Sequence, residues 1–317
     1  MELSIIIVNW ESDIQLTRCL SSIEQNSLDR SYEVHIIDNN SQSIDFGSIV
    51  SEFREVDEFN FYRSSNNIGA AVINEIQERI EGEYVLFLGP DVVILPQSLQ
   101  KLCRHLDQNN SVGGVTAKLL NPDLSAQMYY YRFWNLPMVF FTQTIIGEQL
   151  DSRLLSNRMR KYYYGKEIDV GEATTLDQPP AACLLVRNEL LGSDYIIDPK
   201  FEFYFNDVDV CKRIYDSGYR IDICPSAEVI HKKSSSFTKR QSVWSQYTMK
   251  ADLVEYFRKH HQRQSYIIEA MIIADLLFRI LVIPLHKIII EKDIQQTKIA
   301  AKNNIKILRE YLQERLQ

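Results

Sequence analysis

The amino-acid sequence predicts an α/β protein built on a largely parallel sheet with helices on both faces. Over the first 120 residues, short runs of apolar and β-branched residues alternate with longer segments of helical periodicity. The short runs are continuously apolar, as expected for strands buried on both faces. The chain has 317 residues, 45% apolar and 24% charged. This ordinary globular composition fits one large or two modest domains and argues against disordered, collagen-like and disulfide-stapled classes.

Four strands are predicted in this first part, over 3–8, 34–37, 59–62 and 84–88. Helices are predicted between and after them, over 14–25, 70–80 and 97–106, where capping residues or Pro96 precede the periodic segments. Sheets of this kind bind ligands where their strands end at the carboxyl edge. The polar residues to inspect are therefore those at predicted strand ends: Asn9, Asp38, Asn39 and Asp91.

Residues 121–180 are rich in aromatic side chains, among them Tyr130, Trp134 and a tyrosine run at 162–164. Two interpretations stay open. The segment forms a wall that selects the substrate, or it is an insertion whose aromatics pack on the main domain, as buried aromatics usually do. Further on, the pattern predicts strands over 182–186, 219–223 and 227–230, and a helix over 207–217 that Gly218 closes.

The last 75 or so residues are predicted to be helical. Charged residues and Pro284 interrupt the apolar segment 266–290, so it is not expected to cross a bilayer. On a helix, Asp275, Arg279 and His286 project within about 40° of one another, as a narrow polar stripe beside a wide apolar face. This geometry suits a helix in the plane of a membrane surface, a homodimer seam, or a helix docked on the main domain.

Charge and cysteine content narrow the class further. The formal net charge of −7 argues against nucleic acid as a partner. The five cysteines are an odd number without CxxC spacing, which indicates reduced thiols. The first residues have no basic segment of the kind that opens a secretory signal. Together these features predict a cytoplasmic protein.

Three clusters carry groups suited to chemistry. Asp91 follows a buried strand, where a carboxylate can hold a hard cation or simply open a turn after Pro90. Asp207 and Asp209 lie at a helix start beside an aromatic run; either can be a helix cap, and Asp207 also suits a general base. His231 ends a strand and can ligate a metal, and the Lys, Ser and Arg residues of 232–240 can hold phosphate oxygens.

Taken in order, these segments resemble the family 2 glycosyltransferases of the GT-A fold, and most of all the bacterial rhamnosyltransferase-like branch. The resemblance covers roughly residues 3–240. The matching segments are Val8-Asn9-Trp10, Asp38-Asn39-Asn40-Ser41, Asn67-Ile68-Gly69-Ala70, Gly89-Pro90-Asp91-Val92, Ala181-Ala182, Phe205-Asn206-Asp207-Val208-Asp209 with Arg213, and His231.

The resemblance implies a GT-A domain over 1–240, with a nucleotide-binding half over 1–120 and an acceptor half over 121–240, followed by a helical region over 241–317. It implies an inverting transfer of sugar from a nucleoside-diphosphate sugar, with dTDP-rhamnose favoured and UDP-hexose as alternative. The acceptor would be a glycan or lipid-linked glycan of surface polysaccharide synthesis, reached at the inner membrane face. A divalent cation, Mg²⁺ or Mn²⁺, is implied as cofactor.

The same resemblance assigns roles to residues. The implied donor-binding residues are Val8, Asn9, Trp10, Asp38, Asn67, Gly69 and Asp91. Asp38 would accept from the N3–H group of the base, Asp91 and His231 would hold the metal, and Asp207 would be the catalytic base with Asp209 as second choice.

Three positions depart from the family pattern: Gly89, Ala181 and Asn206. These departures leave open a second interpretation, in which the protein keeps the fold and binds sugar nucleotides or acts as a scaffold without catalysis. A third interpretation is a nucleotidyltransferase. Such an enzyme would bind a triphosphate with a loop that contains glycine and a basic residue, and residues 9–16 contain neither.

Overall fold

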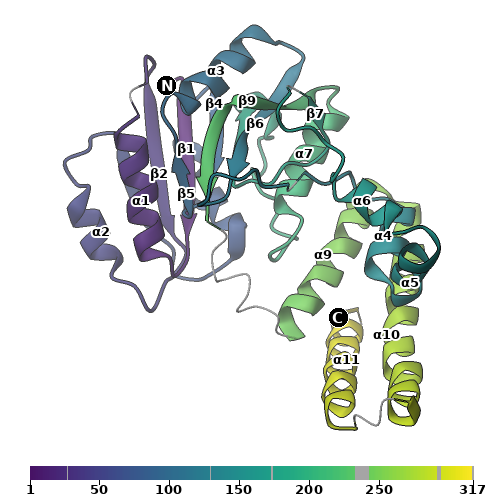
Figure 1. Ribbon diagram of the computed structural model, residues 1–317. Coiled ribbons are helices and arrows are strands. Elements are labelled where there is room, and N and C mark those ends of the chain that lie inside the picture. Colours follow the sequence, from purple (N-terminus) through teal and green to yellow (C-terminus); the bar gives the residue numbers. More distant parts are fainter. Residues whose placement is uncertain (27, 129, 173, 233–242, 291–293, 316–317) are drawn as a thin grey trace. The chain divides into compact units, whose positions relative to one another are not determined.

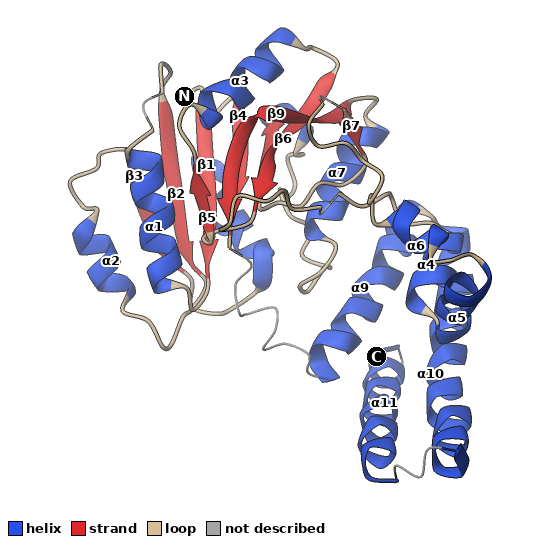
Figure 2. Ribbon diagram, in the orientation of Figure 1, coloured by secondary structure: helices blue, strands red, loops and turns tan. Residues whose placement is uncertain are grey.

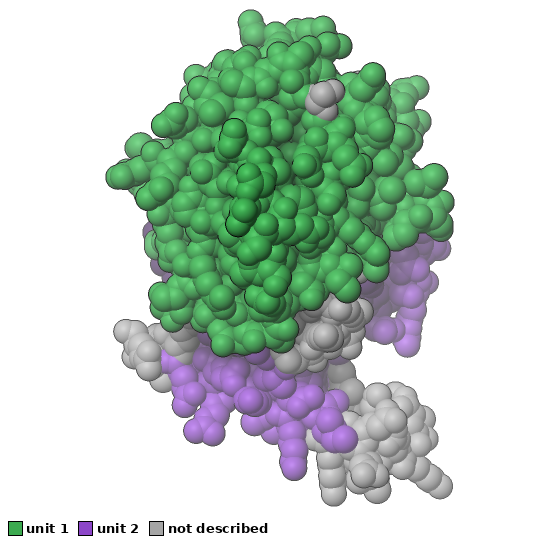
Figure 3. Space-filling view, turned by 90° about the vertical axis from the view of Figure 1, so that its left-hand side faces the viewer, with its two compact units in different colours: residues 1–133, 164–202, 206–234 green, residues 134–163, 203–205, 235–317 purple. Residues whose placement is uncertain are grey.

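A computed structural model describes residues 1–26, 28–128, 130–172, 174–232, 243–290 and 294–315, and the chain divides into two compact units (Figure 3). The sheet unit comprises residues 1–133, 164–202 and 206–234, and the helical unit residues 134–163, 203–205 and 235–317. The predicted boundary at residue 240 lies outside the described residues. The division into a transferase domain and a C-terminal region therefore stays a prediction.

One mixed sheet organises the sheet unit (Figure 2), and nine strands of the described chain belong to it. Its order is β3-β2-β1-β4-β8-β6-β9-β5, with β7 paired to β9. The strands β1 to β4 run parallel, β8 runs antiparallel between β4 and β6, and β6 is parallel to β9. The strand bounds are β1 Leu3–Asn9, β2 Tyr32–Asp38, β3 Phe59–Arg63, β4 Tyr84–Leu88, β5 Val92–Ile94, β6 Val112–Leu120, β7 Thr175–Leu176, β8 Cys183–Arg187 and β9 Arg220–His231.

Helices cover both faces of this sheet, as predicted (Figure 1). Alternate residues of β1 serve the two faces: Ile5 and Ile7 belong to one apolar core, and Ile6 belongs to the other. The first core is completed by α1 Asp13–Glu24, α2 Phe46–Glu52 and α3 Ser98–Gln108, and the second by η1 Gly69–Arg79 and α7 Asn206–Asp216. A short turn of helix, η2 Asn188–Leu190, follows β8.

Two elements differ from their predictions. The segment predicted as an α-helix over 70–80 is the 3₁₀ helix η1, in which residues three apart form a row. Ile73 and Ile76, which are spaced in this way, are both buried in the second core. The two strands predicted over 219–223 and 227–230 are one strand, β9, whose pairing with β6 shifts register between Ala117 and Lys118. Such a shift lets one strand continue past a local irregularity.

The helical unit contains α4 Leu136–Gln143, α5 Ile145–Leu154, α6 Arg158–Tyr163, α9 Val243–His260, α10 Gln262–Ile290 and α11 Ile294–Arg315. Its apolar side chains are buried where α9, α10 and α11 pack together, including Phe257, Leu276 and Tyr311. Among the described helices, none has the combination of length and apolar character that crossing a membrane requires.

Asp275, the first residue of the polar stripe predicted on α10, lies in the interior of the helical unit. Asp275 is almost fully buried, its carboxylate accepts a hydrogen bond from the backbone N–H of Ile145 at 2.8 Å, and it pairs with Arg279 at 2.6 Å. The contact of Asp275 with Ile145 satisfies one of the unpaired N–H groups at the start of α5. The side chain of His286 lies outside the described side chains.

Candidate functional site

The ends of β1 and β2 place the first predicted site residues together. In the parallel pairing of these strands Asn9 stands beside Asp38, and the Asn9 amide donates to a carboxylate oxygen of Asp38 at 3.1 Å. The other carboxylate oxygen of Asp38 accepts from the N–H of Ser41 at 3.2 Å and lies 3.4 Å from Arg63. Asn9 and Asp38 are fully buried. Both oxygens of Asp38 therefore already have protein partners, so a contact of Asp38 with a base stays a prediction.

A second group of site residues is the loop that leads into η1. The side chain of Asn39 donates to the Asn67 side chain at 3.0 Å and to the Gly69 carbonyl at 2.9 Å, and it accepts from the N–H of Ile68 at 3.2 Å. Gly69 has φ +65, and a Cβ there would lie 2.5 Å from the carbonyl oxygen of Glu202. Only glycine fits this position, because the conformation is left-handed and the approach is close.

Asp91 and His231 meet because of the register between β5 and β9. His231 stands opposite Val92 in this antiparallel pairing, and the N–H of Lys232 donates to the carbonyl of Asp91 at 3.0 Å. The Nε2 atom of His231 lies 3.6 Å from the Oδ1 atom of Asp91, and the two side chains are 15% and 13% exposed. This spacing is beyond a direct hydrogen bond. Two side chains predicted as metal ligands from distant parts of the sequence are thus neighbours.

The spacing of these two atoms fits a shared divalent cation. Ligand atoms that each lie about 2.0–2.2 Å from one ion stand roughly 3–4 Å apart, depending on the coordination geometry. The Nε2 and Oδ1 atoms fall within that range. No group of three or more His, Cys, Asp or Glu side chains suited to a metal ion occurs among the described residues. An ion here would therefore need further ligands from water or a bound diphosphate.

Gly89, the first departure from the family pattern, leaves room for Asp91. A Cβ at position 89 would lie 2.9 Å from the Oδ1 atom of Asp91, which is closer than such contacts normally come. The N–H of Gly89 donates to the carbonyl of Ala182 at 2.9 Å. Gly89 thus gives space to the carboxylate that follows it and connects the end of β4 to the start of β8.

Asp207 lies at this same edge of the sheet. Its carboxylate accepts from the N–H of Ala181 at 3.4 Å and from the N–H of Val208 at 2.9 Å. Loss of water around the group raises the pKa of Asp207 above its ordinary value, and the two hydrogen bonds only partly oppose this effect. A carboxylate with a raised pKa at the head of a helix is suited to take a proton.

Asp209, the second choice for the base, has a different environment. It is fully buried and accepts a hydrogen bond from the Nε atom of Arg213 at 3.0 Å. The same guanidinium donates to the carbonyls of Leu191 and Ile196. Asp209 and Arg213 therefore hold α7 to the segment after β8.

The remaining predicted residues lie in varied surroundings. Val8 and Trp10 are half-buried at the carboxyl end of β1. Tyr130 is fully buried in a small core with Leu176 and Ile223, so it packs inside the sheet unit and is no substrate wall. Trp134 is also buried, and its ring contacts that of Phe205 at a tilt of 52° in the helical unit. The predicted phosphate-holding residues of 233–240 lie outside the described residues.

Gln127 is a site residue that the sequence does not single out. Its side chain donates to the carbonyl of His231 at 2.6 Å, and its Oε1 atom lies 2.9 Å from the Nδ1 atom of the same histidine. It is almost fully buried. A lone glutamine after a turn has no sequence signature, so only the fold reveals this contact.

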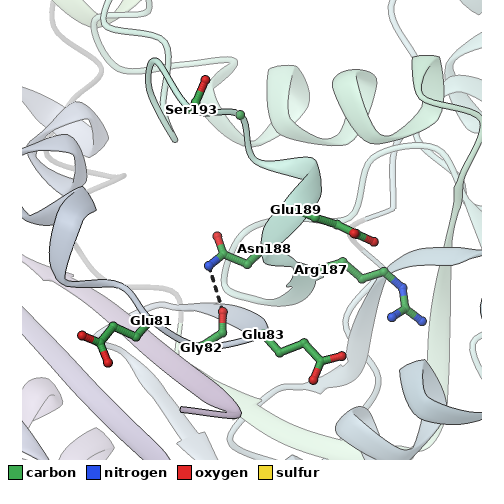
Figure 4. A pocket seen from close by; sticks show the side chains of 8 residues that line it. Glu81, Gly82, Glu83, Arg187, Asn188, Glu189 and Ser193 are labelled. Atoms are coloured by element: carbon green, nitrogen blue, oxygen red, sulfur yellow. Dashed lines mark hydrogen bonds between the residues drawn. The ribbon is translucent and has the colours of Figure 1, made fainter.

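An open groove of about 720 Å³ lies at the opposite edge of the sheet (Figure 4). It is lined by the residues before β4 and after β8, including Glu81, Glu83 and Glu189. Asn188 donates to the carbonyl of Gly82 across it at 2.8 Å. The groove is lined by these three carboxylates and one guanidinium, that of Arg187, so its excess of negative charge makes it a poor place for a diphosphate. The residues at the carboxyl edge remain the candidate site.

Comparison with known proteins bears on this arrangement. Residues 4–163, half of the chain, match the sequence model of the family described as Glycosyl transferase family 2. The chain belongs to this family. The predicted resemblance is therefore confirmed, and the protein is a glycosyltransferase.

A curated relative of this glycosyltransferase is the rhamnosyltransferase WbbL of Escherichia coli (strain K12), which is 22% identical over 72% of this chain and 82% of its own. The uncharacterized protein y4gI of Sinorhizobium fredii (strain NBRC 101917 / NGR234) is 26% identical over 74% of this chain, but only 24% of its length is matched. The first of these relatives supports the rhamnosyltransferase-like branch.

Solved structures share the fold of this family 2 glycosyltransferase. They include GalNAc-T7 with UDP, GalNAc and Mn²⁺ (TM-score 0.55, 14% identity, 80% of this chain and 47% of that one). The mannosyltransferase PcManGT of Pyrobaculum calidifontis with GDP-Man and Mn²⁺ matches with a TM-score of 0.54, 14% identity, and coverage of 98% and 74%. S. aureus TarS 1-349 with UDP-GlcNAc matches at 0.54, 15% identity, and 99% and 92%. The fold is GT-A.

Proposed function

We propose that this glycosyltransferase is metal-dependent and inverting, and that it moves a sugar from a nucleoside-diphosphate sugar to a hydroxyl group. The observation that carries the proposal is the edge at which Asp91 and His231 lie 3.6 Å apart while Asp207 is connected through Ala181 and Ala182 to the same strand end. Two ligands for one metal ion and a base with a raised pKa are the two features that a single displacement needs.

Asp207 is the proposed base. Its carboxylate takes the proton of the acceptor hydroxyl, the hydroxyl oxygen forms a bond to the anomeric carbon, and the bond from that carbon to the diphosphate oxygen breaks. The proton ends on Asp207 and the negative charge on the nucleoside diphosphate. One displacement from the opposite side inverts the anomeric configuration.

Asp91 and His231 would hold the divalent cation, Mg²⁺ or Mn²⁺. When bound, the ion would neutralise charge on the departing diphosphate. Two of the solved structures that share the fold contain Mn²⁺, which supports a cation of this kind here. The carboxylate and the neutral imidazole of this chain are ligands that accept either ion, with imidazole favouring Mn²⁺.

The donor is proposed to bind at the ends of β1 and β2 and in the loop before η1. We keep Val8, Asn9, Trp10, Asp38, Asn67 and Gly69 as donor residues, as the resemblance implies. The likeness to a rhamnosyltransferase favours dTDP-rhamnose. UDP-hexose is the alternative, and the UDP-GlcNAc in the S. aureus structure is in line with a uridine donor.

The acceptor is proposed to be a glycan or a lipid-linked glycan in surface polysaccharide synthesis, bound mainly by the 121–240 half. A cytoplasmic enzyme that touches the inner membrane face would meet such an acceptor. Exposed apolar side chains on α10 support this contact: Tyr266 is 70% exposed and Leu281 60%. The same residues serve equally as a seam between two copies of the chain. No contact with nucleic acid is proposed.

The test is calorimetric titration with a panel of donors: dTDP-rhamnose, UDP-glucose, UDP-galactose, UDP-N-acetylglucosamine and GDP-mannose, each with Mg²⁺, Mn²⁺ or chelator. We expect one donor to bind, and binding to weaken with chelator and in Asp91→Ala. The matched control is Asp194→Ala, which removes an exposed aspartate next to Ser193 of the groove at the opposite edge. A folded protein that binds no donor in any metal would instead support the scaffold interpretation.

A further inference from the structure

We propose that Gln127 is a positioning residue that fixes the tautomer and the orientation of His231, so that this histidine presents Nε2 to the metal. The inference rests on the proposed metal site of Asp91 and His231. It concerns two hydrogen bonds between one glutamine side chain and one histidine, both formed inside the sheet unit.

The direction of the Gln127 amide follows from its partners. One end of the amide lies 2.6 Å from the carbonyl oxygen of His231, which can only accept a hydrogen bond. The group at that end must therefore be the NH₂ donor. The carbonyl oxygen Oε1 is then at the other end, 2.9 Å from the Nδ1 atom of the imidazole.

The histidine tautomer follows in turn. Because Oε1 is an acceptor, the Nδ1 atom must carry the hydrogen in this contact. In the neutral imidazole the lone pair is then on Nε2, the atom that lies 3.6 Å from the Asp91 carboxylate. A metal-binding histidine is commonly held in this way, with its second ring nitrogen donating to a neighbouring oxygen.

The position of Gln127 is itself fixed by the backbone. After β6 the chain turns at residues 121–125, and the returning segment donates from the N–H of Gln127 to the carbonyl of Leu119 at 2.8 Å. Leu119 and Leu120 pair with Val229 and Ile230 of β9, so the returning segment passes beside the end of that strand. The turn thus delivers a buried amide to His231.

The first measurement needs no metal. In protein labelled with ¹⁵N-histidine, spectra recorded at about pH 8 distinguish the two neutral tautomers, and His231→Gln identifies the signal. We expect His231 to carry its hydrogen on Nδ1 in the original protein and to lose this preference in Gln127→Leu. An unchanged tautomer in Gln127→Leu would overturn the inference, whatever the metal does.

The second measurement is the affinity for Mn²⁺, from the electron paramagnetic resonance of the free ion, with dTDP or UDP present. We expect Gln127→Leu to bind Mn²⁺ about 10- to 100-fold more weakly. Gln127→Glu should fall between the original protein and Gln127→Leu, because its carboxylate still accepts from Nδ1 but sets an oxygen in place of the donor against the carbonyl of His231. Equal affinity in Gln127→Leu and in the original protein would overturn the inference.

Two controls separate this inference from other effects. Gln178→Leu removes another almost buried glutamine, whose amide donates to the carbonyl of Arg132 at 2.6 Å, and it should leave the tautomer and the Mn²⁺ affinity unchanged. If Gln127→Leu does not fold, Gln127→Met repeats the test. An original protein that binds no Mn²⁺ contradicts the proposed metal dependence, and the tautomer measurement then still decides the role of Gln127.

Discussion

His231 stands directly opposite Val92 in the antiparallel pairing of β5 with β9, and this register brings its ring beside the carboxylate of Asp91. β5 has only three residues, and a slip of one position would set another residue opposite His231 and move Asp91 away from the imidazole. The distance between the two candidate metal ligands, Asp91 and His231, therefore depends on the register between β5 and β9.

Asp207→Asn should strongly lower the rate of transfer and leave donor binding intact. Loss of a general base lowers turnover by about 10²- to 10⁴-fold. The check is turnover in a transfer assay beside calorimetric donor affinity. A scaffold protein would lose nothing, and Asp216→Asn, a substitution at the exposed end of α7, serves as the control.

Asp207→Asn should also raise the melting temperature at pH 7. The pKa of Asp207 is raised in the folded protein because burial penalises the charged form. Stability from the neutral carboxyl is thus fully present below the ordinary pKa of aspartate and is lost as the pH rises through the raised value. Asparagine has no charged form and avoids this loss. Thermal denaturation at pH 7 should therefore give a higher melting temperature for Asp207→Asn than for the original protein, and the difference should shrink toward pH 3.5.

Asn39→Ala should disorder the loop before η1. Asn39 makes three hydrogen bonds to residues 67–69 and is almost fully buried, so its removal leaves backbone groups of this loop without partners. We expect a loss of about 1–3 kcal/mol in the free energy of unfolding and weaker donor binding. Urea denaturation and calorimetry measure the two effects. Asn60→Ala, a half-buried asparagine of β3, should change donor affinity little.

His105→Gln should remove a pH dependence of stability. The hydrogen bond to Asp222, and then one to Cys224, raise the pKa of His105 to about 9. Stability from the charged imidazole is present below about pH 6.5 and is lost as the pH rises through about 9. Urea denaturation at pH 6 and pH 9.5 should show a loss on the order of 2 kcal/mol in the original protein. An equal loss in His105→Gln would contradict this assignment.

Asp275→Ala should destabilise the helical unit. The substitution removes an acceptor from the N–H of Ile145 and leaves Arg279 without its partner at 2.6 Å. We expect a cost of about 2–3 kcal/mol in chemical denaturation. Asp275→Asn keeps an acceptor for the N–H of Ile145, so its stability should lie between that of the original protein and that of Asp275→Ala. Full stability of Asp275→Ala would mean that the polar stripe of α10 contributes no packing energy.

Continuous apolar runs made the first four strands predictable. β4 has the bounds that the sequence predicts, and β1, β2 and β3 extend theirs by one to three residues. Gly218 ends α7 with φ +86, as its place after a helical pattern predicts. These elements are specified locally, by burial on both faces and by backbone conformation.

The strand β6 is not among the predicted strands, and it contains two consecutive glycines, Gly113 and Gly114. In the structure a Cβ on Gly113 would lie 2.7 Å from side-chain atoms of Leu190 and Tyr219 and 2.8 Å from Ile214. Leu190 belongs to η2, Tyr219 directly precedes β9 and Ile214 belongs to α7, so the requirement for glycine arises only once the sheet is assembled. Leu190, Ile214 and Tyr219 are all far from Gly113 in the sequence, so a local sequence pattern does not reveal this requirement.

The candidate site divides in the same way. Asp91, Asp207 and His231 lie in segments with a recognisable pattern, so the resemblance to the family was sufficient to name them. Gln127 and the closeness of Asp91 to His231 depend on the pairing of β5, β6 and β9. Pairing between distant segments is a property of topology, which one sequence does not reveal.

The acidic groove before β4 offers a place for chemical labelling. All five native thiols are buried, so a cysteine introduced at the exposed Ser193 would be the most accessible one for a maleimide dye. Ser193 lies at the edge of the sheet opposite to Asp91. A fluorophore there could report tumbling or surface attachment of the enzyme while the carboxyl edge stays unmodified.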